Sequence, residues 1–129
     1  MNIRKLSIRL DGFSGNLLEK IPDRNKPLDI EVTHRVKIDQ MEGGTEAVYH
    51  LYTDVAPSPR ALFTCQVDQD IHVEFVEALN KEEMVDLAYQ ICSNGANQLS
   101  FIVASITREL IETPILLPTS LNAQAFEIV

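Results

Sequence analysis

The sequence of 129 residues contains no tryptophan, only two cysteines and few aromatic residues (6%). Cys65 and Cys92 lack a Cys-x-x-Cys spacing and lie on apolar patterns, which is typical of reduced, buried thiols. No apolar run approaches the ~20 residues of a transmembrane helix, and no signal peptide is recognisable. We therefore expect a cytoplasmic protein that does not insert into membranes.

Basic residues are scarce in the second half of the chain. Residues 1–60 carry nine acidic and nine basic residues, whereas residues 61–129 carry ten acidic residues against Lys81 and Arg108. The second half therefore supplies the whole net charge of −8. Such a protein repels nucleic acid and anionic lipid, so neither is expected as a partner. The charge can favour basic or partly unfolded polypeptides, or it can simply maintain solubility.

Catalytic and metal-binding patterns are also lacking. His34, His50 and His72 are scattered along predicted strands without metal-ligand spacing, and His34 fits a hydrogen-bonded core imidazole. The acidic cluster in residues 82–86 lies at a predicted helix start, where the helix dipole favours carboxylates. We therefore expect no catalytic residues, no metal and no cofactor.

What the first half does contain is a pattern of alternating residues. Residues 28–39 alternate apolar and polar side chains, which predicts a strand with one buried face, and residues 41–44 supply a glycine turn. Further strands are predicted from Glu46 to Thr53, over residues 61–71, and near Leu6 to Leu10. The segment Asp11 to Pro27 is predicted as a loop. These elements indicate an antiparallel four-stranded meander.

The second half carries helical patterns. Asn80 and Glu83 form a capping-box pattern before a helix that Ser93-Asn94-Gly95 ends. A second helix from near Asn97 is apolar enough to be sandwiched, and Thr113-Pro114 cannot continue it. An extended apolar tail follows. We predict a single domain over residues 1–129, with an α+β fold in which two C-terminal helices pack on one face of a four-stranded antiparallel sheet.

The order of these elements resembles a known family. The segments ALFTCQV, IHVEFV, MVDLAYQICSNG and LSFIVASITRELIETPILLPTSLN are similar in order and spacing to the SecB-like export chaperones. The similarity covers roughly Leu28 to Phe126 and is greatest to a small Gram-positive branch. It implies a SecB-like fold, a homo-oligomer (dimer or tetramer), and unfolded polypeptides as clients. The N-terminal strand lacks the family's Ser-Phe-Glu-x-Pro-like element and the acidic tail is missing, so we do not expect SecA as a partner.

The resemblance also implies a client-binding groove. In SecB-like proteins the crossover between the last strand and the first helix lines this groove together with the second helix. The corresponding apolar residues are Ile71, Val73, Phe75, Val76, Leu79 and Phe101. The alternative is that the stretch from Ile71 is the end of a strand that packs on the sheet.

Three function classes remain open. The first is a non-enzymatic chaperone or polypeptide-binding protein. The second is an oligomeric scaffold or regulator that keeps the fold without chaperone activity. The third is an enzyme, for which the sequence offers no catalytic constellation.

Overall fold

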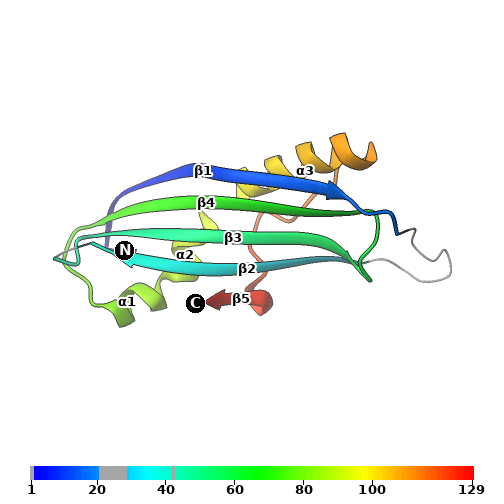
Figure 1. The fold of residues 1–129 in the computed structure, drawn as a ribbon. Helices are drawn as coiled ribbons and strands as arrows, with labels where there is room; N and C mark the ends of the chain where they lie inside the picture. Colours follow the sequence, from blue (N-terminus) through cyan, green and yellow to red (C-terminus); the bar gives the residue numbers. More distant parts are fainter. Residues whose placement is uncertain (1, 21–28, 42) are drawn as a thin grey trace.

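The structure, a computed structural model, describes residues 2–20, 29–41 and 43–129. Figure 1 shows long strands with helices on one side. The strands are β1 (Ile3–Leu17), β2 (Asp29–Gln40), β3 (Glu46–Ser58), β4 (Phe63–Phe75) and β5 (Phe126–Ile128). The helices are α1 (Lys81–Asp86), α2 (Ala88–Ser93) and α3 (Ala96–Ile111), and a 3-10 turn spans Ala123–Ala125.

The strands of the described residues form one sheet in the order β1-β4-β3-β2-β5. Neighbours among β1 to β4 pair antiparallel, whereas the short β5 pairs parallel with β2. The α+β fold and its antiparallel sheet are therefore confirmed, with a fifth strand added. The plain meander is wrong for the first strand, because β1 pairs with β4 and not with β2.

The predicted loop from Asp11 to Pro27 is also wrong in its first part. β1 runs on to Leu17: the register with β4 shifts between Leu10 and Gly12, and Gly12 to Leu17 then pair with β4 one residue to one. At Gly15 a Cβ would lie 2.5 Å from Ile106 Cγ2 and 2.8 Å from a Leu110 methyl, so any side chain there would require these residues of α3 to move. This glycine therefore marks a close helix–strand contact within a strand. Residues 21–27 of the predicted loop lie outside the described residues.

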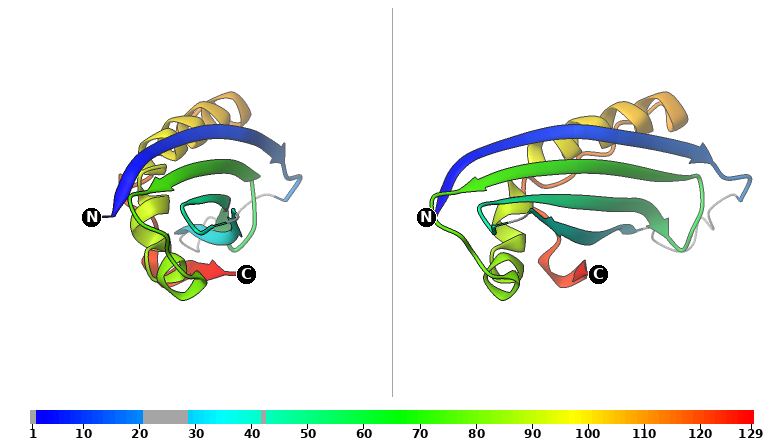
Figure 2. Two further views of the ribbon diagram at one scale, coloured as in Figure 1. Left: turned by 90° about the vertical axis from the view of Figure 1, so that its left-hand side faces the viewer. Right: turned by 60° about the vertical axis from the view of Figure 1, so that its left-hand side comes forward.

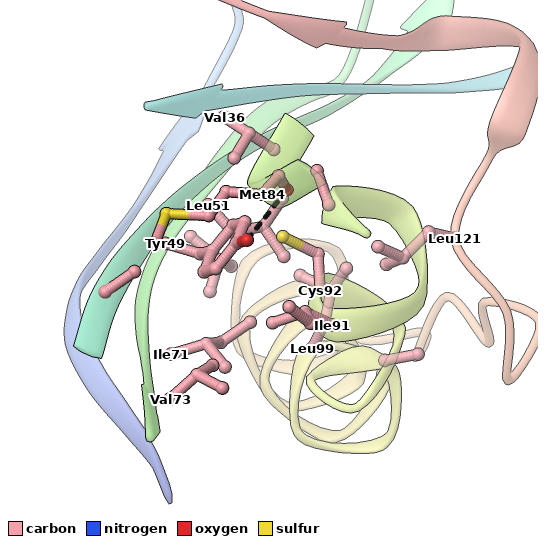
Figure 3. Close-up of a cluster of buried hydrophobic side chains, with 14 of the residues drawn as sticks. Val36, Tyr49, Leu51, Ile71, Val73, Met84, Ile91, Cys92, Leu99 and Leu121 are labelled. Atoms are coloured by element: carbon pink, nitrogen blue, oxygen red, sulfur yellow. Dashed lines mark hydrogen bonds between the residues drawn. The ribbon is translucent and has the colours of Figure 1, made fainter. Parts of the chain in front are cut away.

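The helices cover one face of the sheet and leave the other face open (Figures 1 and 2). Along β4 every second residue from Phe63 to Phe75 is buried, and the residues between are partly or fully exposed. The buried side chains meet those of the helices in a single cluster, part of which is drawn in Figure 3: Val36, Tyr49, Leu51, Ile71, Val73, Met84, Ile91, Cys92, Leu99 and Leu121.

The first helix begins as predicted. The Asn80 side chain accepts a hydrogen bond from the backbone N–H of Glu83, and the Glu83 carboxylate accepts one from Asn80 N–H, which completes the capping box. The helical segment then bends at Leu87, so the single predicted helix is two short ones, α1 and α2. The hydroxyl of Tyr49 on β3 donates to the Met84 carbonyl oxygen (2.7 Å), which ties α1 to the sheet.

Helix α3 packs by one face. Leu99, Val103 and Thr107 are buried, whereas Phe101 on the outer face is 70% exposed, so the predicted sandwich is incomplete within this chain. Glu112 adopts the left-handed conformation (φ 62°) that ends a helix, just before Thr113-Pro114. In the part of the chain that the structure describes, no helix is long and apolar enough to cross a membrane.

Candidate polypeptide-binding cleft

Most of the predicted groove residues lie inside the core. Ile71 and Val73 are fully buried and Phe75 is 3% exposed, all three on β4, and Leu79 is 7% exposed. The prediction that these four residues line an exposed crossover is therefore wrong for this chain. The alternation simply continues to the end of the strand, as the alternative held. Val76 (63% exposed) and Phe101 (70% exposed) are accessible, and their role in client binding stays a prediction.

An open apolar cleft lies elsewhere, between β2, the start of α3 and the chain that follows α3. Its volume is about 510 Å³. β2 contributes Ile30, Val32 and His34, and α3 contributes Ala96 and Leu99. The third wall is formed by most of residues 115–124. The residues that line it include no Asp, Glu, Lys or Arg.

The tail is held against α3 by hydrogen bonds to its backbone. The Ser100 hydroxyl donates to the Leu117 carbonyl oxygen (3.3 Å), and the Ile115 N–H donates to Thr107 Oγ1 (2.7 Å). Pro114 and Pro118 prevent the tail from forming a helix or a regular strand. The two hydrogen bonds to α3 therefore supply partners for backbone groups of the tail. The tail therefore lies alongside the helix as an extended wall.

The far end of the tail is fixed by α2 and by β2. The hydroxyl of Tyr89 donates to the carbonyl oxygen of Leu121 (2.9 Å), and the Leu121 side chain is 4% exposed. The side-chain amide of Asn122 donates to the Val32 carbonyl oxygen on β2 (2.8 Å). The tail then turns and enters β5 beside His34 to Val36.

His34 is the titratable side chain of the cleft. It is 1% exposed; its Nε2 accepts a hydrogen bond from the Asn122 N–H (3.1 Å) and its Nδ1 lies 2.9 Å from Thr53 Oγ1. Because Nε2 accepts, the proton of the neutral ring is on Nδ1, which donates to Thr53. Burial lowers the pKa of His34 to about 4, so the ring is neutral near pH 7. As expected from the sequence, His34 is a hydrogen-bonded core imidazole.

Two positions on the rim of the cleft are accessible to a large ligand. Leu116 is 79% exposed and Ile30 is 37% exposed. Sequence reasoning identified the tail as apolar and extended but did not assign it to a site. The available signal was a run of large apolar residues between two prolines, in a segment that follows a helix end.

The open face of the sheet carries a row of charged groups instead of a cleft. His50 Nδ1 lies 2.6 Å from Asp70 Oδ1, and His50 Nε2 lies 2.7 Å from Asp39 Oδ2. Arg9 pairs with Asp70 at 3.2 Å, so the row crosses from β1 to β2. Partial burial lowers the pKa of His50, but the hydrogen bonds to Asp70 and Asp39 outweigh it and raise the pKa.

This row does not have the geometry of a metal site. When the ring is charged, both ring nitrogens of His50 donate to carboxylates, so neither has a lone pair free to bind a metal. Over residues 2–20, 29–41 and 43–129, no group of three or more His, Cys, Asp and Glu side chains is placed to hold a metal ion. Burial also raises the pKa of Cys65 to about 11 and that of Cys92 to about 12, so neither thiol is activated as a nucleophile.

Known proteins resemble this chain in fold but not closely in sequence. No family model matches the sequence, and no curated protein is similar to it. A solved structure of the Mycobacterium tuberculosis Rv1957 SecB-like chaperone, in complex with a ChAD peptide from the Rv1956 HigA1 antitoxin, superposes with a TM-score of 0.72. The identity is 15%, over 90% of this chain and 88% of that chain. The fold is therefore SecB-like, as the sequence predicted.

A second solved structure is a protein of unknown function from Streptococcus agalactiae. Its TM-score is 0.48 and its identity is 11%, over 88% of this chain and 97% of that chain.

Proposed function

We propose that this protein of SecB-like fold is a non-enzymatic polypeptide-binding protein that holds unfolded or partly folded chains. The observation that carries the proposal is the open, uncharged cleft of about 510 Å³ between β2, α3 and the tail. Folded proteins seldom leave such an apolar hollow empty of function, and an extended apolar segment of another chain fits its chemistry. The SecB-like protein of M. tuberculosis was solved with a peptide bound, which supports the same class of ligand.

The charge of the protein supports the same class of ligand. The net charge is −8, but the residues that line the cleft carry no formal charge. An unfolded basic chain would be attracted over distance by the acidic surface and would place its apolar residues in the cleft. Electrostatic attraction of this kind weakens with salt, whereas apolar burial does not. We place this activity in the cytoplasm, where two free thiols stay reduced.

Leu116→Asp is the direct test of the cleft. Leu116 is 79% exposed, so the substitution should leave the melting temperature nearly unchanged. A carboxylate at the rim should weaken binding of a reduced, carboxymethylated unfolded protein by about tenfold, because it removes roughly the burial energy of one leucine. Binding is measured by fluorescence anisotropy of the labelled client.

Met41→Asp is the matched control, since Met41 is 41% exposed and lies beside Arg9 and Asp70 of the open face, away from the cleft. Equal weakening by both variants would contradict a role for the cleft. Phe101→Asp and Val76→Asp, measured in the same way, show whether the binding surface extends to the two accessible residues of the predicted groove. A wild-type protein that binds no unfolded client and does not suppress its aggregation would favour the oligomeric scaffold instead.

We also propose a homo-oligomer, assembled through β1 and α3. β1 is an edge strand of 15 residues, and edge strands of this length are normally covered. Phe13 is 60% exposed there, beside an apolar hollow that Gly15, Ile106 and Leu110 also line. Light scattering at tens of micromolar that gave the mass of a monomer would contradict this assembly.

A further inference from the structure

The outer edge of β2 is only partly used by this chain. On its inner side β2 pairs with β3 from Asp29 to Gln40. On its outer side it pairs with β5 at His34, Arg35 and Val36 alone. Among the described residues, Asp29 to Thr33 therefore have no strand on that side.

The direction of the backbone groups at this edge is fixed by two hydrogen bonds. The Val32 carbonyl oxygen accepts from the Asn122 side-chain amide, and the Val36 carbonyl oxygen accepts from the Val129 N–H. In a strand the N–H and C=O of one residue point to the same side and alternate from residue to residue. The N–H and C=O of Ile30 therefore also point outward.

The same residues supply the floor of the cleft. Ile30, Val32 and His34 line it, so the outward backbone groups and the apolar side chains of this stretch face one space. The Asn122 side-chain amide already takes the Val32 carbonyl oxygen, so Ile30 supplies the outward backbone groups to which a new strand would bond, and β5 shows that a strand can lie on this edge. The edge is thus built to accept extended backbone.

We propose that a polypeptide segment binds this cleft by adding a strand to β2 at residues 29–33, with every second side chain buried in the cleft. The preferred segment is extended and uncharged, with apolar residues at alternate positions, because the lining has no charged side chain to pair with. Main-chain hydrogen bonds supply sequence-independent affinity, and the cleft selects the alternate side chains. This inference rests on the proposed function and specifies its binding mode.

The test uses backbone N-methylation of a peptide. The probe is a fluorescein-labelled, end-capped peptide of alternating valine and threonine, compared with two versions that are N-methylated at every valine or at every threonine. In an added strand, the N–H groups of one set face β2 and those of the other set face solvent. One methylated version should bind about tenfold or more weakly than the parent, and the other should bind like it, because only one loses hydrogen bonds. Which set matters also reports whether the added strand is parallel or antiparallel.

Ile30→Pro provides the matched change in the protein. It removes one outward N–H, and proline is tolerated at an edge strand in this position, so the melting temperature should change little while the peptide affinity falls. If both methylated peptides bind like the parent, or both fail, strand addition is wrong. An unfolded carboxymethylated protein measured in parallel separates the two proposals: if it binds while methylation has no effect, the proposed function stands alone, and if neither it nor the parent peptide binds, both proposals fail.

Discussion

The two faces of the sheet hold two histidines in opposite states. His34, on the face covered by the helices, is buried and neutral, with a pKa lowered to about 4. His50, on the open face, lies between two carboxylates, and its pKa is raised. The two histidines lie on the adjacent strands β2 and β3, and the difference between their pKa values comes from the groups around each ring.

The difference shows how one sheet can present an apolar face and a hydrated face. The covered face is apolar and continues into the uncharged cleft, whereas the open face carries cross-strand ion pairs that keep it hydrated. Strand alternation makes this separation possible, because neighbouring residues point to opposite faces. Substitutions at adjacent positions of β4 therefore test each face separately.

The largest expected difference between the faces is in thiol reactivity. Cys65 and Cys92 lie on the covered side, at 1% and 0% exposure, and their raised pKa values further suppress the thiolate. Labelling of the native protein with a thiol reagent should be at least about a thousandfold slower than labelling in urea, because it requires opening of the core. Gln66→Cys places a thiol next to Cys65 but on the exposed side, and it should react rapidly. Rapid stoichiometric labelling of wild-type Cys65 would contradict the burial.

Truncation of side chains at the end of β4 should lower the free energy of unfolding much more on the covered face than on the open face. Phe75→Ala should lower the free energy of unfolding by about 3 kcal/mol or more, since Phe75 is 3% exposed and a cavity would remain. Glu74→Ala on the open face should change it by no more than ~0.5 kcal/mol. Urea denaturation of both variants gives the comparison. Similar effects of the two changes would mean that Phe75 is not in the core in solution.

The position of Phe75 shows how far the sequence predicted the fold. Alternation, the capping box at Asn80 and the proline after α3 are local signals, and each was read from a few neighbouring residues. The end of β4 carries the same alternation, but the family resemblance favoured a crossover there. A pattern of residues in one strand was a better guide than the boundary expected from relatives.

Features that depend on distant contacts could not be predicted in this way. The partner of β1 is decided by pairing with β4 across the whole chain, and Gly15 gains its role only when α3 passes over it. The bend between α2 and α3 is likewise stabilised by a side chain of the sheet, far away in the sequence. The buried Gln69 side chain on β4 donates to the Gly95 carbonyl oxygen and to Gln98 Oε1 (both 3.0 Å). The cleft joins β2 to a tail 90 residues later along the chain, measured from Val32 to Asn122, so no local pattern describes it.

The pH dependence of stability should also reflect the two faces. Between pH 6.5 and about 4 the unfolded chain binds a proton at residue 34 that the native ring does not bind, so acid destabilises the fold. The contribution of the neutral His34 ring to the free energy of unfolding is fully present above pH 6.5. About 2 kcal/mol of this contribution should be lost at pH 5. His50 acts in the opposite sense: its contribution is full below pH 6.5 and is lost as the pH rises through its raised pKa.

Single variants separate these two contributions. Urea denaturation from pH 7.5 to 5 should show a larger acid loss for His50→Gln than for the wild type, and a smaller one for His34→Gln. An imidazole titration followed by NMR should place the midpoint of His34 near 4 and that of His50 above 6.5. A His34 midpoint near 6.5 would contradict its hydrogen bond from Asn122.

The smallest effect is expected from the ion pairs of the open face. Asp70→Asn should lower the pKa of His50 and reduce the free energy of unfolding at pH 6 by at most about 1 kcal/mol, because the partly exposed pair is screened by solvent. The titration of His34 should not change, since the substitution is on the other face. A shift of both imidazoles would mean that the two faces are electrostatically coupled through the sheet.

The hydrogen bond from Tyr49 to Met84 also gives the protein an intrinsic optical reporter. With no tryptophan and three tyrosines, its near-ultraviolet signal comes mainly from phenol rings, and Tyr49 is the fully buried one. Burial and the nearby Cys92 raise its pKa, so its phenol should ionise in alkali only after the ring is released. Near-ultraviolet circular dichroism and alkaline difference absorbance would therefore follow the docking of α1 on β3 without any attached dye (Figure 3).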